Sequence, residues 1–296
     1  MTLQQLRQVL TIAESNSMNE AAKKLFVSQP NLSATVREVE EELGITVFMR
    51  NNRGITVTAE GEEFLGYAKQ VVEQYHLLEN RYLNVESKKK FSVSMQHYSF
   101  AVKAFVQLAK EVGMDEYEFA VHETKTKEVI DNVKNLKSEI GVLYLSDFNE
   151  KVLRKLFKEC DIEFKELFTC NTYVYLWKKH PLAGQKVITL DDLQEYPCLT
   201  FEQGVNNSFY YAEEMMSTYE YKRVIKADDR ATMLNLMVGL NGFTLCSGII
   251  SEDLNGDDYA AIPLKESEIM HIGYIKHKGT KLSKLGEIYI DALKNY

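Results

Sequence analysis

The sequence of 296 residues predicts an α/β protein with a small helical head, a long single helix and a larger α/β body. Three observations support this prediction. Capped apolar stripes of helical period fill residues 2–43, a heptad repeat runs over 59–88, and strand and helix signals alternate from residue 91 onward. The body of roughly 200 residues is long enough for two small domains, each with its own core.

The head begins with three helices, each opened by a capping residue. Thr2 with Gln5, and Ser17 with Glu20, have the spacing of a capping box, in which two unpaired N–H groups are satisfied reciprocally. Ser28 supplies a third N-cap soon after the second helix. The last two helices follow one another so closely that they predict a helix-turn-helix.

The second helix of this pair has polar faces that could meet a DNA groove. Its apolar residues form one buried stripe at spacings of 4, 3 and 4: Leu32, Val36, Val39 and Leu43. The candidates for contact in the major groove are Ser28, Gln29, Asn31, Ser33, Ala34 and Arg37. Arg37 could instead pair with Glu41 one helical turn later and make no DNA contact.

A short basic hairpin is predicted next. Residues 47–49 alternate in polarity, the chain turns at 51–54, and residues 55–57 return. Arg50 and Arg53 lie on this hairpin, where arginine can touch phosphate or enter a narrow minor groove. We therefore interpret it as the wing of a winged helix-turn-helix.

Residues 1–61 resemble the winged helix-turn-helix of LysR-type transcriptional regulators through AAKKLFVSQPNLS, EVEEELGITVF and RNNRGITVTAEG, which stand in family order. The rest of the chain has the length and layout of that family. Asn31 and Ala34 depart from the residues that many members carry, so the resemblance gives no base preference. It implies a pseudo-palindromic promoter site in double-stranded DNA as a partner, with RNA polymerase as a candidate further partner.

The helix after the hairpin is expected to mediate self-association. Apolar residues alternate at spacings of four and three without proline, which is the period of a coiled coil. The predicted seam consists of Phe64, Ala68, Val71, Tyr75, Leu78 and Tyr82. A homodimer, or a tetramer, would offer two recognition helices to two half-sites. The alternative is a helix that packs only on its own domain.

The body begins with alternating strand and helix signals. In order, the pattern predicts strand 91–95, helix 99–111, strand 117–122, helix 127–136 and strand 140–145. This βαβαβ order implies a parallel sheet whose ligand site lies beyond the carboxyl ends of the strands.

A second set of elements predicts another lobe of the body. It comprises strand 172–177, helix 190–193, strand 198–201, a helix after residue 206 and strand 242–246. A strand at 268–276 and a helix at 282–293 are expected to return to the first lobe.

The family resemblance implies an effector body like the periplasmic binding proteins: two α/β lobes joined by crossing strands near 164–168 and 262–269, with the effector between them. The expected division is a winged helix-turn-helix at 1–58, a dimerisation helix at 59–90, lobe I at 91–166 plus 268–296, and lobe II at 167–267.

Helix starts that follow strands suggest where an effector would bind. Their unpaired N–H groups and partial positive charge suit a carboxylate, sulfate or phosphate. We expect such seats at 97–99 and 200–204, and by the resemblance the candidate contacts are Tyr98, Ser99, Thr124, Tyr144, Thr200, Phe201 and Gln203. Ser99 and Thr200 could equally be plain N-caps. The expected effector is an amino acid or a small organic anion. Gly248 stands where relatives often have proline, which predicts a looser loop.

Charge separates the head from the body. Residues 1–58 hold six basic and six acidic side chains, so the net charge of −8 lies after residue 58 and the body should not itself bind DNA. No apolar run approaches the ~18 residues of a membrane span, and no leader is apparent. We expect a cytoplasmic protein with no membrane partner.

Catalysis and metal binding have no visible residues in the sequence. The four cysteines, Cys160, Cys170, Cys198 and Cys246, form no CxxC pair and have no histidine at metal spacing, so no cofactor is expected. Redox sensing through them is a minor alternative. The predicted function is sequence-specific DNA-binding transcriptional regulation, as activator or repressor, modulated by a small-molecule effector. The competing class is a stand-alone metabolite-binding protein or enzyme of the same two-lobed shape.

Overall fold

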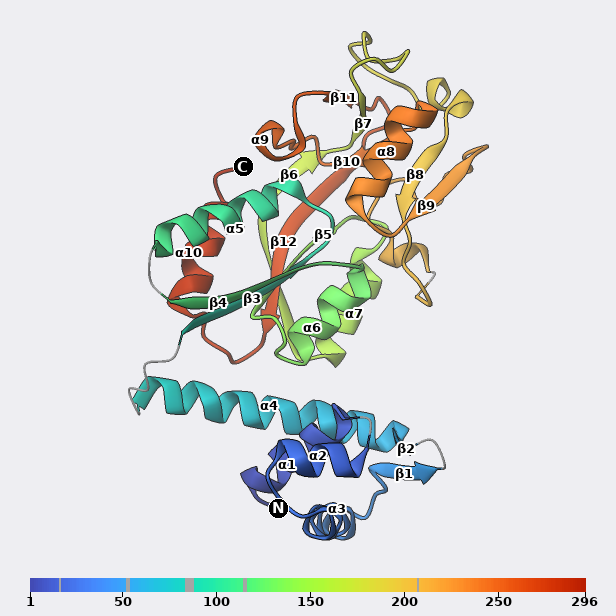
Figure 1. Cartoon of the computed structure of the whole chain (residues 1–296). Coiled ribbons are helices and arrows are strands. Elements are labelled where there is room, and N and C mark those ends of the chain that lie inside the picture. The colour runs from blue at the N-terminus through green and yellow to red at the C-terminus, as the bar shows by residue number, and fades with distance from the viewer. Residues whose placement is uncertain (16, 52–53, 83–87, 114–115, 207) are drawn as a thin grey trace. The chain divides into compact units, whose positions relative to one another are not determined.

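A computed structural model describes residues 1–15, 17–51, 54–82, 88–113, 116–206 and 208–296, with the backbone alone for residues 50, 51, 54 and 80–82 (Figure 1). Its internal contacts divide the chain into two units, Met1–Ser87 and Lys88–Tyr296. Each unit has its own hydrophobic core and is described by itself.

The first unit consists of four helices and one hairpin. In chain order these are α1 (Leu3–Ala13), α2 (Met18–Lys24), α3 (Gln29–Leu43), β1 (Phe48–Asn51), β2 (Gly54–Val57) and α4 (Ala59–Tyr82). Thr2, Ser17 and Ser28 are the N-caps of the first three helices, and each side chain accepts a hydrogen bond from a backbone N–H three residues later. The predicted helix starts are therefore confirmed, including the complete capping box of Thr2 and Gln5.

The core of this unit is built where α1, α2 and α3 cross. Ala21 and Ala22 of α2 are buried and let α3 approach closely, and Leu32, Val36 and Val39 fill the space between the helices. Leu43 was expected to complete the stripe but is 38% exposed. The helix ends at Gly44, whose left-handed backbone turns the chain away before this last position reaches the core.

The first lobe of the second unit is a five-stranded sheet in the order β4-β3-β5-β12-β6. Its strands are β3 (Lys89–Met95), β4 (Tyr117–Glu123), β5 (Ile140–Leu145), β6 (Ile162–Asn171) and β12 (Ile269–His277). The pairs of β3 with β4 and with β5 are parallel, as the βαβαβ pattern predicted, whereas β12 runs antiparallel between β5 and β6. The carboxyl ends of the three parallel strands therefore meet at one edge of the sheet.

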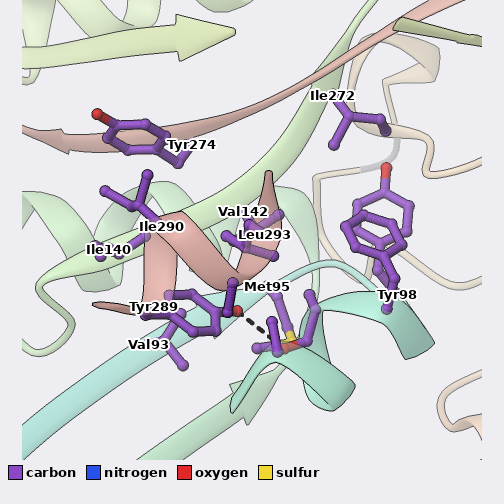
Figure 2. Packing of buried hydrophobic residues seen from close by; sticks show 14 of the residues in the cluster. Val93, Met95, Tyr98, Ile140, Val142, Ile272, Tyr274, Tyr289, Ile290 and Leu293 are labelled. Atoms are coloured by element: carbon purple, nitrogen blue, oxygen red, sulfur yellow. Dashed lines mark hydrogen bonds between the residues drawn. The ribbon is translucent and has the colours of Figure 1, made fainter. Parts of the chain in front are cut away.

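Helices cover both faces of this sheet, with α5 (Ser99–Val112) and α10 (Lys284–Leu293) on one face and α6 (Thr126–Lys134) and α7 (Glu150–Glu159) on the other (Figure 1). Figure 2 shows Tyr289 and Leu293 of α10 packed near Val93, Met95 and Val142 of the strands. The Tyr289 hydroxyl, although buried, donates to the backbone oxygen of Ala101 at 3.1 Å. This bond fixes α10 against α5.

The second lobe joins two small sheets around a separate core. Its elements are β7 (Tyr173–Trp177), η1 (Asp192–Glu195), β8 (Cys198–Phe201), η2 (Phe209–Tyr211), β9 (Val224–Ala227), α8 (Arg230–Leu240), β10 (Thr244–Cys246), α9 (Glu252–Asn255) and β11 (Tyr259–Pro263). Strands β10, β7 and β11 are antiparallel, and β8 pairs in parallel with β9. The chain enters the lobe between β6 and β7 and leaves it between β11 and β12.

Two helices predicted for the second lobe are wrong, and four elements were not predicted. The segment after residue 206 contains only the single turn η2, and the turn near residue 190 is the short η1. The helix of this lobe is α8, whose apolar residues lie on both sides and hide the helical period, while β9, β11 and the polar α7 of lobe I were also missed. Among the described residues, no helix is long and apolar enough to cross a membrane.

Candidate functional site

The outer side of α3 presents the polar residues that the sequence selected. Ser28, Asn31, Ala34 and Arg37 are exposed, while Gln29 and Ser33 are half-buried. The Gln29 side-chain amide donates to the Ser33 hydroxyl at 2.7 Å, so these two side chains orient one another. The helix therefore offers hydrogen-bonding groups to solvent along its first two turns and Arg37 further on.

Arg37 forms the ion pair that the sequence left open as an alternative. Its Nε lies 2.9 Å from Glu41 Oε1 on the next turn, and both side chains are mostly exposed. An exposed pair of this kind contributes only about 0.3–0.5 kcal/mol, so a phosphate can displace the carboxylate at little cost.

Glu40 has a structural role that the acidic run 38–42 concealed. One of its carboxylate oxygens accepts from the backbone N–H of Val47 at 2.7 Å and of Phe48 at 3.0 Å. This side chain therefore ties the end of α3 to the start of the hairpin. The interpretation of the whole run as a solvated face is wrong at this position.

The predicted hairpin is confirmed, with Phe48 opposite Val57 and Asn51 opposite Gly54. Arg50 stands on β1 opposite Ile55, and the structure describes its backbone alone. Arg53 lies outside the described residues. The hairpin that carries both arginines thus begins directly after the Glu40 anchor.

An exposed aromatic residue between α2 and α3 was missed. Phe26 is 96% exposed, and its φ of 55° is a left-handed conformation that few residues other than glycine adopt. The side chain precedes the Ser28 cap by two residues, at the end of α3 that carries the candidate DNA contacts. Its hydrophobicity made it a core candidate in the sequence, and only the structure reveals its exposure.

The long helix α4 uses part of its predicted seam within its own unit. Ala68, which is 2% exposed, and Val72 pack against Leu6 of α1, and Phe64 joins this cluster. Ala68 is therefore not available to a partner helix, and the purely intermolecular seam is wrong there. An exposed apolar row remains beside it at Tyr67, Val71, Tyr75, Leu77 and Leu78, while the side chain of Tyr82 lies outside the description.

In the second unit, the predicted anion seat at residue 97 is occupied by a carboxylate of the protein itself. Glu213 Oε2 accepts from the backbone N–H of His97 at 2.9 Å and lies 2.8 Å from His97 Nδ1. The other oxygen, Oε1, accepts from the Gln203 side-chain amide at 2.9 Å. The imidazole of His97 also stacks on Phe201, with ring centroids 3.7 Å apart. Glu213 therefore joins the second lobe to the strand end of the first.

Further hydrogen bonds extend this connection across the strand ends. Gln203 accepts from the backbone N–H of Thr126 at 3.1 Å, and the Thr126 hydroxyl lies 2.7 Å from the backbone oxygen of Tyr211. The Tyr144 hydroxyl donates to the backbone oxygen of Ala212 at 3.1 Å. Residues 203–214 are thus held to lobe I by side chains from three of its segments, and this explains why the predicted long helix does not form there.

A small cavity lies beside this network, with a volume of about 80 Å³. Its walls come from the start of α5, the end of β8, α8, β10 and the start of β12. The residues that matter below are His97, Tyr98, Ser99, Tyr175, Phe201, Glu213, Glu214, Arg230, Met233, Met237, Thr244, Cys246, Ser247, Asn255 and Met270. Three of the predicted effector contacts, Tyr98, Ser99 and Phe201, line it.

The other four predicted contacts lie elsewhere. Gln203 and Tyr144 belong to the network between the lobes. The Thr124 hydroxyl donates to the Glu128 carboxylate, and Thr200 lines a separate hollow on the second lobe. The seat expected at 200–204 has no regular helix behind it, since only η2 follows. The wall residues from α8 were missed because that helix was not predicted.

Burial changes the ionisation of the acidic wall. Glu214 is buried, and the loss of hydration together with the neighbouring Glu213 charge raises its pKa to about 8. Its Oε1 accepts from the Phe201 N–H at 2.8 Å. The Arg230 guanidinium is bound to the Glu123 carboxylate.

Gly248 packs tightly, and the expectation of a looser loop is wrong. Its φ is +76°, and a Cβ atom there would come within 2.5 Å of the Tyr173 ring. Glycine therefore allows the chain after β10 to pass directly over β7.

The cysteines do not form a reactive or metal-binding cluster. Burial raises the pKa of the Cys170 thiol to about 11 and that of Cys246 to about 12, which disfavours the thiolate needed for oxidation or ligation. Within the described residues, no group of three or more histidine, cysteine or acidic side chains could hold a metal ion.

Comparison with known proteins identifies the family. Residues 3–62 match the bacterial regulatory helix-turn-helix proteins of the lysR family, and residues 114–296 match the LysR substrate binding domain. The chain belongs to the LysR family. It is a DNA-binding transcriptional regulator with an effector-binding domain, and the family is not one of enzymes, so the predicted regulatory class is confirmed over the enzyme alternative.

Individual relatives of this LysR-family protein match along nearly the whole chain. The regulator CysL of Bacillus subtilis is 24% identical over 301 residues, covering 98% of this chain and 96% of that protein. The regulator TdcA of Escherichia coli is 21% identical over 298 residues, covering 96% and 90%.

Solved structures share the fold. Full-length OxyR from Pseudomonas aeruginosa matches with a TM-score of 0.70 at 19% identity, covering 99% of this chain and 95% of that one. CbnR in complex with its target DNA matches with a TM-score of 0.61 at 16% identity, covering 100% and 99%. The predicted helix-turn-helix, long helix and periplasmic-binding-protein-like body are therefore confirmed.

Proposed function

We propose that α3 is the recognition helix of this regulator and enters the major groove of a promoter site. The observation that carries this is the exposed polar surface formed by Ser28, Asn31, Ala34 and Arg37, with Gln29 and Ser33 beside it. Such side chains can read base edges, while Arg37 and the arginines of the hairpin contact phosphate or the minor groove. Phe26 lies at the DNA-facing end of α3 and contacts the sugar-phosphate backbone.

Self-association completes the DNA-binding form. The exposed apolar row of α4 pairs with the same row of a second chain, because a large apolar surface on a helix is stabilised when it is covered. The homodimer, or a tetramer of two such dimers, binds a pseudo-palindrome with two recognition helices.

The cavity in the second unit receives the small-molecule effector. Tyr98 and Ser99 of lobe I and Phe201 of lobe II all line it, so a ligand there contacts both lobes. The effector acts if it binds one arrangement of the lobes more tightly than another and so shifts the population of DNA-binding states. The Glu213 network supports this mechanism, since it is the polar connection that such a rearrangement would alter.

The test is to select binding sites for the full-length chain from random duplexes and then measure affinity by fluorescence anisotropy. We expect enrichment of an inverted repeat with half-sites about one helical turn apart, or a multiple of it. Enrichment of no sequence, with equal affinity for every duplex, would contradict the proposed recognition by α3.

A further inference from the structure

The interlobe cavity has a chemical character that narrows its ligand. Much of its wall is apolar and includes the side chains of Met233, Met237 and Met270. Its volume of about 80 Å³ corresponds to roughly two or three water molecules, at about 30 Å³ each. The resident molecule is therefore small and has an apolar body.

The charged side chains of the wall already have partners. Arg230 is bound to Glu123, and His97 is bound to Glu213. The Glu214 carboxylate accepts from a backbone N–H. None of the cations among the described lining residues is thus left to receive the carboxylate of a ligand, and Glu213 and Glu214 would disfavour an anion further.

Two hydroxyl groups of the wall lack partners. The Thr244 hydroxyl has no hydrogen bond although the residue is only 6% exposed. The Tyr175 hydroxyl makes no bond of normal geometry, although the Asn255 side chain is its neighbour. A buried hydroxyl without a partner is unfavourable, and a ligand that supplies the missing hydrogen bond is bound more tightly for that reason.

We propose that this cavity takes a small uncharged molecule, with an apolar body and one amide or hydroxyl end that hydrogen-bonds to Thr244. The inference rests on the proposed effector role of the cavity and replaces the expected organic anion by a neutral ligand. Glu213 is the reason for the change, because its carboxylate occupies the N–H at residue 97 on which the anion expectation depended.

The test compares propionamide with propionate, two probes of nearly the same shape that differ in charge. The full-length chain is prepared with ¹³C-methyl methionine, so that Met233, Met237 and Met270 report directly from the wall. We expect propionamide to shift these methyl signals saturably and propionate, at the same concentrations, to leave them unchanged. Propionate shifting them as strongly as propionamide, or neither probe shifting them, would overturn the proposal.

Substitutions locate the contact. Thr244→Val keeps the side-chain shape but removes the hydroxyl, so the affinity for propionamide should fall about fivefold, as for one lost hydrogen bond. Thr169→Val, on an exposed position of β6, is the matched control and should leave the affinity unchanged. Unchanged affinity in the Thr244 variant would contradict the assigned contact, and the comparison of the two probes on the unmodified protein does not depend on the variant folding.

A second variant tests the role of Glu213 in rejecting anions. Glu213→Ala vacates the N–H of His97 and the amide of Gln203, so propionate should now shift the methionine signals. Continued silence toward propionate would contradict this reason for selectivity. DNA affinity measured on the same unmodified sample separates the two proposals: methyl shifts without sequence-specific DNA binding would remove the regulatory mechanism alone, and DNA binding with silent methyls would remove the ligand class alone.

Discussion

Glu213 of the second lobe places one carboxylate oxygen 2.9 Å from the backbone nitrogen of His97, at the end of β3 in the first lobe. The same carboxylate accepts from Gln203, so a single buried side chain satisfies donors on both sides of the interlobe boundary. In this conformation an internal carboxylate occupies the position that the sequence offered to an external one.

Removing this carboxylate should destabilise the effector body. Glu213→Ala leaves the His97 N–H and the Gln203 amide without acceptors and leaves His97 without its partner, which should lower the free energy of unfolding by about 3 kcal/mol. Urea denaturation followed by circular dichroism measures the change. Glu195→Ala removes a carboxylate from an exposed ion pair with Lys222 and should change stability by less than about 1 kcal/mol. Equal effects of the two substitutions would refute the assigned role.

The buried Glu214 predicts a pH dependence of stability. Its pKa is near 8 in the folded protein and close to 4.5 when unfolded, so the folded state holds the proton over that interval. Stability should therefore fall as pH rises from about 4.5 to 8, because the unfolded state loses a proton that the folded state retains. Glu214→Gln cannot ionise, and its stability relative to the unmodified protein should increase over this range by up to roughly 3–5 kcal/mol. Urea midpoints at several pH values give the comparison, and parallel curves would contradict the prediction.

Two glycines of the second lobe should respond to alanine in opposite directions. Gly248→Ala places a Cβ against the Tyr173 ring at a left-handed φ, which should cost about 2–3 kcal/mol or more. Gly239 lies in the exposed part of α8 with open space around it, so Gly239→Ala should stabilise by up to about 1 kcal/mol through helix propensity. Thermal unfolding of both variants is the measurement. A tolerated Gly248→Ala would mean that this loop is looser than the structure indicates.

The pair of Arg37 and Glu41 predicts two opposite effects on DNA binding. Arg37→Ala should weaken binding and, if the side chain contacts phosphate, reduce the slope of log affinity against log salt by about 1 for each head. Glu41→Gln releases Arg37 and removes a negative charge from the same helix, so it should tighten binding. Anisotropy titrations at several salt concentrations measure both. If Arg37→Ala leaves affinity and slope unchanged, Arg37 serves only its intrahelical pair.

The exposed row of α4 predicts the effect of charge on self-association. Leu78→Glu introduces a carboxylate into the proposed helix pair and should weaken the dimer, whereas Gln74→Glu adds the same charge at an exposed polar position of α4 and is the control. Sedimentation velocity over a range of protein concentrations distinguishes the two. A dimer equally stable in both variants would place the interface on another surface.

The sequence by itself determined the local structure of the head and the first half of the body. The caps at Thr2, Ser17 and Ser28 depend on neighbouring backbone groups, and the fully buried β5 is a continuous apolar run, so both are readable without knowledge of distant residues. The family-specific order of the head residues likewise sufficed to indicate the regulatory class.

Only the tertiary structure decided what the polar residues of the body do. Glu213 and His97 are separated by 116 positions, and no local pattern signals their contact. The segment around residue 206 has no long helix because its groups bond to lobe I, while α8 has apolar residues on both sides and therefore no clear period. Likewise, Ala68 fits a heptad but is buried against α1. Periodicity reports how a side chain repeats along one element, whereas the partner that it meets depends on how distant elements pack.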